Sequence, residues 1–204
     1  MAPHVSFNVA TWNGKRYLPD LLSSLGNQTF NGFSVRVIDN ASDDGTMDLL
    51  RRVPNATVIR NARNLGFAAA HNQAIRLALD KWVGEDLGHC YVIVANQDLV
   101  LTPECLRELV SAMEADGSAG SAQGKILRAF IEHPEDEYLV QTICADRIDS
   151  TGLRLLRSRR STDRGAGELD RGQYDQPEEI FGPTGALAIY RASELEDVRF
   201  KDEF

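Results

Sequence analysis

The 204-residue sequence has neither an excess of positive charge nor a long apolar run. Its 22 lysines and arginines face 30 aspartates and glutamates, so the formal net charge is −8 at pH 7. This balance argues against a nucleic-acid backbone or an anionic membrane face as the main partner, although a local site can still bind a small anion. No stretch approaches the ~18 apolar residues of a transmembrane helix, and the N-terminus lacks the pattern of a signal peptide. We expect a cytoplasmic protein without a transmembrane segment.

Cysteine and histidine are also scarce, and their spacing argues against a zinc site. The three cysteines form no C-x-x-C pair, which is typical of reduced thiols that serve as packing residues in the cytosol. The histidines show no H-E-x-x-H or related metal-ligand spacing. The residues concerned are Cys90, Cys105 and Cys144, and His4, His71, His89 and His133.

Three common catalytic motifs are missing as well. The sequence has no G-x-x-x-x-G-K-[ST], so a P-loop enzyme is not supported. The near match to G-x-G-x-x-G at 165–170 lacks the third glycine and follows no strand pattern, which argues against a dinucleotide-dependent dehydrogenase. G-x-S-x-G is absent, so an α/β-hydrolase would have no nucleophile elbow.

The first half of the chain alternates strand-like and helix-like patterns four times. The strand-like runs are rich in valine and isoleucine, and each precedes a stretch with apolar residues spaced by three and four. The runs are 5–10, 34–39, 56–61 and 90–96. Thr102 and Pro103 occupy the N-cap and first helical positions expected for the helix after the fourth run. The pattern predicts a single α/β domain with a mostly parallel, Rossmann-like sheet that is covered by helices on both faces.

The pattern changes after about residue 115. We predict strands within 119–127, 138–148 and 181–191, separated by an almost wholly polar segment at 157–179. A polar stretch of this length within a compact domain is either a mobile loop over a site or a disordered excursion, and we favour the loop.

Polar residues follow each of the four predicted strands, where an open parallel sheet binds its ligands. Asp39 ends the second strand, and its carboxylate could accept the ring N–H of a uracil-like base or bind ribose hydroxyls, with Thr11 and Asn13 nearby. The alternative is that Asp39, Asn40 and Ser42 only cap the next helix. The residues alone leave both interpretations open.

Asp98 is the second informative carboxylate. Mg²⁺ or Mn²⁺ is commonly held by one or two carboxylates together with phosphate oxygens, so Asp98 beside Asn96 could anchor a metal-diphosphate, whereas the alternative is a plain turn. Asn64, Gly66 and Phe67 open a predicted helix, whose free N–H groups favour an anion, although asparagine and glycine are also turn residues.

Four segments together resemble the successive motifs of glycosyltransferase family 2, whose members are inverting nucleotide-sugar transferases with the GT-A fold. These segments are TWN (11–13), VIDNASDDGT (37–46), RNARNLGFAAAHNQAI (60–75) and NQDLVLTPECL (96–106). Their order and spacing match the family across residues 5–106. The stretch 163–191 further resembles bacterial rhamnosyltransferases.

The resemblance implies a division of the domain into a nucleotide-sugar-binding half, 1–115, and an acceptor-side half, 116–204. It assigns donor binding to Thr11, Trp12, Asn13, Asp39, Asn40, Asn64, Gly66, Phe67, Asn72, Asn96, Gln97 and Asp98. Asp98 becomes the acid of a D-x-D-like motif that binds Mg²⁺ or Mn²⁺, with Asn96 where many relatives have aspartate. Gly182, Thr184 and Gly185 fall in the segment near the acceptor and the transferred sugar.

The implied reaction transfers a sugar from dTDP-rhamnose or a UDP-sugar, with inversion, to a hydroxyl of a glycan or lipid-linked glycan in bacterial surface polysaccharide or cell-wall synthesis. This places the protein at the inner face of the plasma membrane as a peripheral protein, and a homodimer is left open. Family members carry the general base in an E-D-x-D-L segment that we expect beyond Phe204, because Asp202 and Glu203 do not match it and are assigned surface or turn roles.

We therefore expect a truncated chain that binds donor but transfers sugar poorly, since general-base catalysis is worth ~10²- to 10⁴-fold. Two alternatives are a nucleotide-sugar-binding domain without activity and a nucleotidyltransferase. The latter is disfavoured because the Gly-rich activating loop is not found after the first predicted strand.

Overall fold

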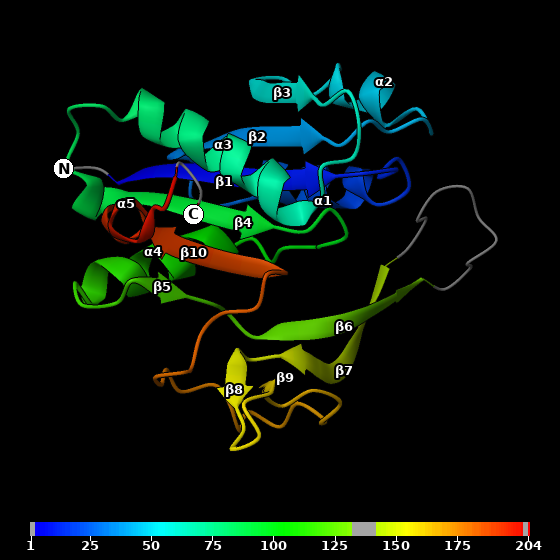
Figure 1. Cartoon of the computed structure of the whole chain (residues 1–204). Coiled ribbons are helices and arrows are strands. Elements are labelled where there is room, and N and C mark those ends of the chain that lie inside the picture. The colour runs from blue at the N-terminus through cyan, green and yellow to red at the C-terminus, as the bar shows by residue number, and fades with distance from the viewer. Residues whose placement is uncertain (1–2, 132–141, 202–203) are drawn as a thin grey trace.

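A computed structural model describes residues 3–131, 142–201 and 204 (Figure 1). Its centre is a six-stranded sheet of order β3-β2-β1-β4-β10-β5. Strands β1 to β4 are mutually parallel, and β10 runs antiparallel to both β4 and β5. The bounds are β1 (His4–Thr11), β2 (Phe33–Asp39), β3 (Ala56–Arg60), β4 (Cys90–Ala95), β5 (Ser121–Ala122) and β10 (Leu187–Arg191). The prediction of a mixed α/β fold with a mostly parallel central sheet is confirmed.

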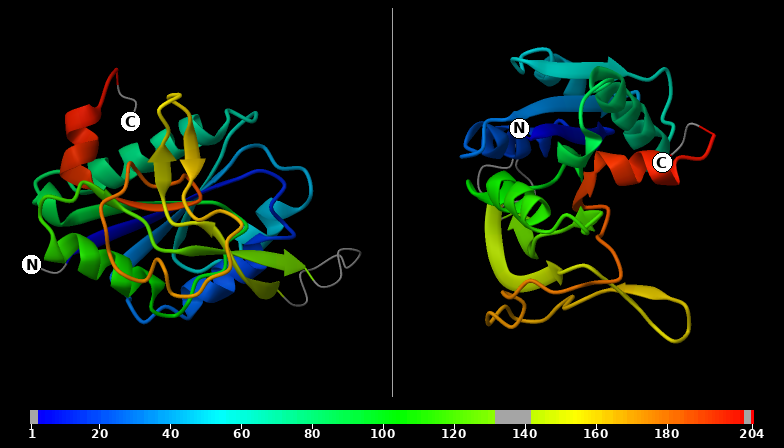
Figure 2. Two further views of the ribbon diagram at one scale, coloured as in Figure 1. Left: turned by 90° about the horizontal axis from the view of Figure 1, so that it is seen from below. Right: turned by 90° about the vertical axis from the view of Figure 1, so that its left-hand side faces the viewer.

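Helices cover both faces of the sheet, as Figures 1 and 2 show. They are α1 (Leu18–Gly26), α2 (Thr46–Leu50), α3 (Phe67–Lys81), α4 (Cys105–Ala115) and α5 (Ala192–Val198), with a 3₁₀ turn η1 (Leu87–His89). The fully buried strand β4 explains this layering. Its residues Tyr91 and Ile93 pack with α1 and α4, whereas Val92 and Val94 on the other face pack with α3 and α5. A strand covered on both faces reads as a continuous apolar run.

Helix α4 begins at Cys105, so the expected N-cap at Thr102 is wrong. The cap comes from a distant residue instead. Gln28 Oε1 accepts a hydrogen bond from the Leu106 N–H at 3.0 Å, and Gln28 Nε2 donates to the Thr102 carbonyl at 2.8 Å. Free N–H groups in the first helical turn need such partners, and a long-range side chain can supply them as well as a local one.

The chain between β5 and β10 forms a separate layer below the sheet in Figure 1. It consists of two antiparallel pairs, β6 (Ile126–Ile131) with β7 (Thr142–Ser150) and β8 (Leu153–Leu155) with β9 (Ser161–Asp163). The strand expected within 119–127 is split between β5 and β6, and residues 138–141 of another lie outside the described residues.

The polar segment 157–179 is partly structured. It contains β9, and two ion pairs fasten its later part, because Lys125 Nζ lies 2.6 Å from Asp170 Oδ2 and 2.5 Å from Asp175 Oδ1. Arg164 pairs with Glu178 within the same region. These ion pairs give much of the segment a defined course. They do so although the segment is too polar to form an apolar core of its own.

The cysteines behave as packing residues where the structure describes their side chains. Cys90 and Cys105 are free thiols, the first buried and the second partly buried. Burial raises the pKa of each to about 11, so both stay protonated at neutral pH. The side chain of Cys144, together with His133, Asp202 and Glu203, lies outside the described part of the structure.

Candidate functional site

The carboxyl ends of β1, β2, β3 and β4 meet at one edge of the sheet. Within this edge, β2 lies on one side of β1 and β4 lies on the other, so the direction of the strand order reverses at β1. In open α/β sheets, ligands bind in the crevice at such a reversal. The loops that follow β1 and β4 are therefore the first place to look for a site.

Asp98, in the loop after β4, has an exposed carboxylate. Among the described residues, nothing forms a hydrogen bond or ion pair with that carboxylate. The loop itself is held in place, because the Asn96 N–H donates to the Ala186 carbonyl at 2.9 Å. A rigid loop with a free carboxylate at a strand end is suited to bind a cation.

The residues around Asp98 fit a divalent cation only as an open site, in which the protein supplies few of the ligands. The described residues contain no group of three or more histidines, cysteines, aspartates or glutamates that could enclose a metal ion. Mg²⁺ and similar hard cations are often bound by only one or two carboxylates, with substrate phosphates and waters as the remaining ligands. Asp98 beside Asn96 fits a cation that binds together with a diphosphate.

Asp39 is fully buried at the end of β2. The Ser42 N–H lies 3.3 Å from each of its carboxylate oxygens, and the Ser42 hydroxyl donates to Oδ1. Arg60 Nε lies 3.4 Å from Oδ2. The carboxylate therefore holds the turn after β2. It does not cap α2, whose N-cap is Gly45 without a side-chain hydrogen bond, so the capping alternative is wrong for Asp39. The contact of Asp39 with a nucleotide stays a prediction.

The loops after β1 and β2 are joined by hydrogen bonds from backbone N–H groups. Asn13 donates to Ser42 Oγ at 2.9 Å, and the Asp43 N–H donates to Asn13 Oδ1 at 3.1 Å. The next N–H group, that of Gly14, donates to Thr46 Oγ1 at 2.9 Å. Asn13 adopts a left-handed backbone (φ 50°), which asparagine tolerates better than most residues. These contacts fix the two loops relative to each other.

The residues of the N-Q-D segment and of the T-W-N segment lie in contact. Gln97 Oε1 accepts hydrogen bonds from the Thr11 hydroxyl at 2.5 Å and the Trp12 N–H at 3.1 Å. The Trp12 side chain itself is 54% exposed beside them. The structure thus brings Thr11, Trp12, Asn13 and the loop of Asp98 together at one end of the sheet.

The loop after β3 is fastened to the same edge by Asn40. Its side-chain Nδ2 donates to the Gly66 carbonyl at 3.3 Å, and its Oδ1 accepts from Asn61 Nδ2 at 2.9 Å. Asn64 Oδ1 accepts from the Gly66 N–H at 2.8 Å. Gly66 has a φ of 85°, a conformation that a residue with a Cβ rarely adopts, so glycine is required immediately before α3.

The segment assigned to the acceptor side reaches the start of α3. The Thr184 N–H donates to Gln123 Oε1 at 2.6 Å, and the Gly182 carbonyl accepts from the Leu153 N–H at 2.8 Å. A Cβ at Gly185 would lie 3.4 Å from the ring of Phe67, which is 47% exposed. Residues 182–185 and the start of α3 therefore lie side by side.

Asn72 has a different partner from the other predicted residues. Its Oδ1 accepts a hydrogen bond from the Phe204 N–H at 3.2 Å, and its side chain is nearly buried. Among the described residues, the hydrogen bond given for the Asn72 side chain is to Phe204, and its contact with a nucleotide stays a prediction.

His71 is a residue that the sequence analysis did not assign to the site. It is 4% exposed, and its ring packs at a tilt against Phe67 with centroids 4.3 Å apart. Neither ring nitrogen has a hydrogen-bond partner in the described structure. Burial lowers its pKa to about 4, so the imidazole stays neutral near pH 7. The sequence signal for this contact was the spacing of four residues between Phe67 and His71, which places both side chains on one face of a helix.

The buried imidazole predicts a specific loss of stability in acid. Because the folded-state pKa is about 4 and the unfolded value is about 6.5, the unfolded chain takes up the proton first as the pH falls. At pH 5, His71 is expected to have reduced the free energy of unfolding by about 2 kcal/mol relative to pH 7. Urea unfolding at both pH values should show a smaller decrease for His71→Met than for the wild type. Equal decreases for this variant and for the control His4→Gln, at a half-exposed side chain, would contradict the assignment.

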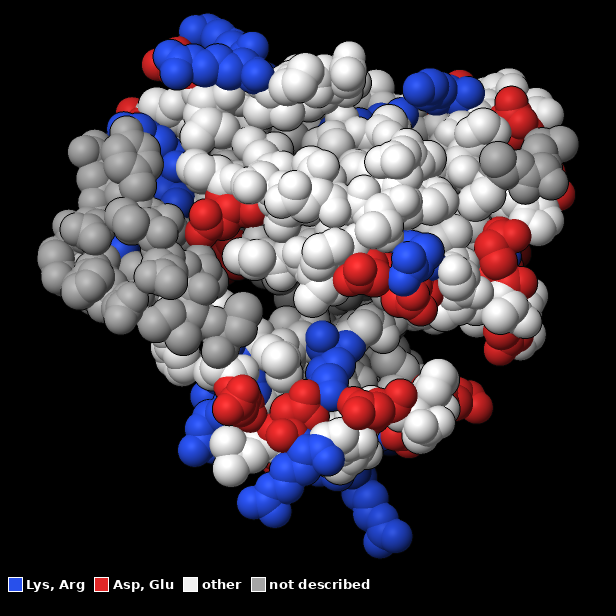
Figure 3. Space-filling view, turned by 180° about the vertical axis from the view of Figure 1, so that it is seen from behind, with Lys and Arg blue, Asp and Glu red and all other residues white. Residues whose placement is uncertain are grey.

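The face seen in Figure 3 is hollowed between the body of the sheet and the layer of β6 to β9. Basic and acidic side chains are interspersed around this recess, so this face carries no extended patch of one charge sign. The strongly basic stripe that binding to a nucleic-acid backbone requires is not found on it. Within the described ranges, none of the helices has the length and apolar character needed to cross a bilayer.

Comparison with known proteins gives a family match over nearly the whole chain. A model described as glycosyl transferase family 2 matches residues 6–199. An N-acetylglucosaminyl-diphospho-decaprenol L-rhamnosyltransferase of Mycobacterium tuberculosis is 33% identical over 123 residues, which are 58% of this chain and 39% of the relative. The abequosyltransferase RfbV of Salmonella typhimurium is 44% identical over 69 residues, 30% of this chain and 21% of that protein. The matched region of this chain spans about two fifths of the mycobacterial relative's length.

Solved structures confirm the GT-A fold. The mannosyltransferase PcManGT of Pyrobaculum calidifontis, in complex with GDP-Man and Mn²⁺, matches 97% of this chain with a TM-score of 0.60 at 20% identity. The S. aureus protein TarS 1-349, in complex with UDP-GlcNAc, matches 95% with a TM-score of 0.56 at 21% identity. In each case the chain covers 47% of the solved structure.

Proposed function

The chain belongs to glycosyltransferase family 2, and from this membership we propose that the carboxyl edge of its sheet binds a nucleotide-sugar donor. The whole protein then transfers the sugar, with inversion, to a hydroxyl of a glycan or lipid-linked glycan. The observation that carries the proposal is the free, exposed carboxylate of Asp98, at the carboxyl edge of the sheet where the strand order reverses.

The proposed donor is dTDP-rhamnose or a UDP-sugar. Support comes from the mycobacterial relative, which is named a rhamnosyltransferase, and from the TarS structure in complex with UDP-GlcNAc. The name of the mycobacterial protein also supports a lipid-linked acceptor, which a peripheral protein would reach at the inner face of the plasma membrane. Because the chain covers only part of each relative, donor and acceptor are proposals for the whole protein.

In this proposal, different residues at the sheet edge bind different parts of the donor. Asp98 and Asn96 would hold Mg²⁺ or Mn²⁺ together with the diphosphate, and the cation would supply charge neutralisation for the leaving group. The exposed ring of Trp12 offers a flat apolar surface to the nucleoside, and Asp39 keeps the turn after β2 in position beside it. Gly182, Thr184 and Gly185 lie near the transferred sugar and the acceptor, and Phe67, which Gly185 approaches, contributes to the nucleotide side. The general base is not assigned to any described residue.

Calorimetry with purified protein tests this function. The ligands are dTDP-rhamnose, UDP-GlcNAc and a nucleoside triphosphate, each with and without Mn²⁺. We expect a diphosphate sugar to bind, more tightly with Mn²⁺ than without it. Tight binding of the triphosphate with no preference for diphosphate sugars would instead favour a nucleotidyltransferase. If none of these ligands binds, the proposed function is wrong.

A further inference from the structure

Gln97 joins the loop that follows β4 to the loop that follows β1. The parallel ladder between β1 and β4 ends at the pair Val9 and Ala95. Beyond it, β1 continues along β2 as far as Thr11, whereas β4 ends at Ala95, and a loop follows each strand. The Gln97 side chain crosses between these loops. Its Oε1 lies 3.1 Å from the Trp12 nitrogen, and its Nε2 donates to the Trp12 carbonyl at 3.3 Å.

The side-chain amide therefore replaces a peptide group of the ladder. A backbone amide in a sheet donates one hydrogen bond and accepts one, and Gln97 offers the Trp12 backbone both of these bonds. Oε1 also accepts from the Thr11 hydroxyl at 2.5 Å, so both of its lone pairs are used. An oxygen with two donors already in place has no acceptor capacity left for a ligand.

The space for this amide depends on a neighbouring glycine. A Cβ added at Gly14 would overlap Thr11 Oγ1 and would lie 2.6 Å from Gln97 Oε1. The backbone at Gly14 is not left-handed, so the requirement for glycine is one of room alone. Gly14 and Gln97 are thus two parts of the same contact, contributed by the loops that follow β1 and β4.

The two residues beside this contact are those that the proposed function uses. Trp12 presents its exposed ring from the β1 loop, and the carboxylate of Asp98 follows Gln97 directly in the β4 loop. Resting on the proposed function, we propose that Gln97 is a positioning residue that couples the nucleoside surface at Trp12 to the metal-diphosphate site at Asp98. The Gln97 side-chain oxygen already accepts two hydrogen bonds, so Gln97 acts through the loops it joins rather than as an acceptor for the donor. Gln97 fixes the spacing between the Trp12 ring and the Asp98 carboxylate, so that one nucleotide can contact both at the same time.

Coupling of this kind has a measurable consequence. When two contacts with one ligand depend on a shared rigid link, removing either contact also weakens the other, and the double variant loses less than the product of the two single losses. We expect this non-additivity, of about 5- to 30-fold in the affinity for Mn²⁺-UDP or Mn²⁺-dTDP, between Trp12→Ala and Asp98→Asn. In the Gln97→Leu background the two losses should multiply to within about twofold.

Two further variants separate coupling from folding. Gly14→Ala should reproduce the effect of Gln97→Leu, and the two together should lose no more than one alone, since both break the same contact. Gln176→Leu is the matched control, because it makes the same substitution at an exposed glutamine and should leave the non-additivity intact. Hydrogen exchange at the Trp12 amide should accelerate in Gln97→Leu, with amides of the β4 core unchanged.

The outcomes distinguish this inference from the function on which it rests. If the wild-type chain binds neither nucleotide, the proposed function fails and the coupling fails with it. If nucleotide binds but the non-additivity between Trp12→Ala and Asp98→Asn persists in Gln97→Leu, the function stands and the positioning role of Gln97 is wrong. Loss of non-additivity in Gln97→Leu and Gly14→Ala, but not in Gln176→Leu, supports the proposal.

Discussion

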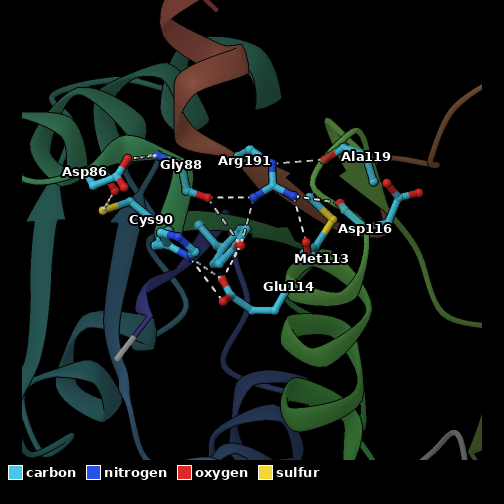
Figure 4. Close-up of polar contacts among 10 residues, drawn as sticks. Asp86, Gly88, Cys90, Met113, Glu114, Asp116, Ala119 and Arg191 are labelled. Carbon is cyan, nitrogen blue, oxygen red and sulfur yellow. Dashed lines mark hydrogen bonds and ion pairs between the residues drawn. The ribbon is translucent and has the colours of Figure 1, made fainter. Parts of the chain in front are cut away.

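Replacing Arg191 with methionine is expected to lower the free energy of unfolding by about 3–5 kcal/mol. Arg191 ends β10 and is 6% exposed. As Figure 4 shows, its guanidinium donates to the carbonyls of Gly88, Met113 and Ala119, at 2.6, 2.7 and 3.1 Å. A fourth carbonyl, that of Asp116, accepts at 3.0 Å. Removing the guanidinium takes one donor from each of four carbonyls. The Asp116 carbonyl still accepts from the Ala119 N–H at 3.2 Å and the Gly88 carbonyl lies within 3.4 Å of the Tyr91 hydroxyl, so the loss falls mainly on Met113 and Ala119, at about 1–3 kcal/mol for each carbonyl that stays buried.

The same guanidinium joins a second network. The Tyr91 hydroxyl accepts from Arg191 Nη1 at 3.0 Å and donates to the carboxylate of Glu114. Burial, together with the Glu114 carboxylate, raises the pKa of Tyr91 to about 12, so the hydroxyl keeps its proton throughout the neutral range. The hydrogen bond from Tyr91 in turn lowers the pKa of Glu114. Arg191 thus links β4, β10 and the end of α4.

Urea unfolding at pH 7 measures the predicted loss for Arg191→Met. The control is Arg157→Met at an exposed arginine, which should change stability by no more than about 0.5 kcal/mol. Arg191 pairs with Tyr91 near the amino end of β4, at the opposite end of that strand from Asp98, so nucleotide affinity of the folded variant should be unchanged. A loss below about 1 kcal/mol would show that water replaces the guanidinium at the four carbonyls.

The central sheet was predictable because its physical cause is local. Strand β4 is buried on both faces, and this produces the continuous apolar run that the sequence analysis used. The start of α4 was not predictable from its own residues, because Gln28, 78 positions away, supplies the cap. The boundaries of β5 and β6 depend likewise on partners, since β5 is two residues long and pairs only with β10.

The location of the site was predictable from the sequence. Which of its side chains hold the loops and which are available to a ligand was not. Strand order places the loops after β1 and β4 together, and polar residues at strand ends can be read from the sequence. Aspartate, asparagine and glutamine serve equally well as turn caps and as ligand contacts, however. The side chains of Asp39, Asn40 and Gln97 all form hydrogen bonds with neighbouring backbone groups. The Asp98 side chain forms none within the described structure. Only three-dimensional contacts separate these cases.

The absence of internal partners makes Asp98 the residue whose substitution should affect binding most. We expect Asp98→Asn to reduce the Mn²⁺-dependent affinity for UDP or dTDP by ~10²-fold, because asparagine keeps the shape but removes the charge that attracts the cation. The affinity measured without metal should stay within about twofold. Since no described side chain relies on the carboxylate, the free energy of unfolding should also stay within about 0.5 kcal/mol.

Two variants at the same edge make the result for Asp98→Asn specific. Asp43→Asn removes the same charge from an exposed position in the loop after β2, so it reports the general electrostatic effect and should change the metal-dependent affinity by less than about threefold. Asp39→Ala removes the acceptor that holds the Ser42 turn, and should weaken nucleotide binding to the same degree with and without Mn²⁺. Calorimetry of all three variants in Mn²⁺ and in chelator separates these roles. Equal, metal-independent losses for Asp98→Asn and Asp39→Ala would mean that Asp98 supports the loop rather than the cation, because only a metal ligand distinguishes the two conditions.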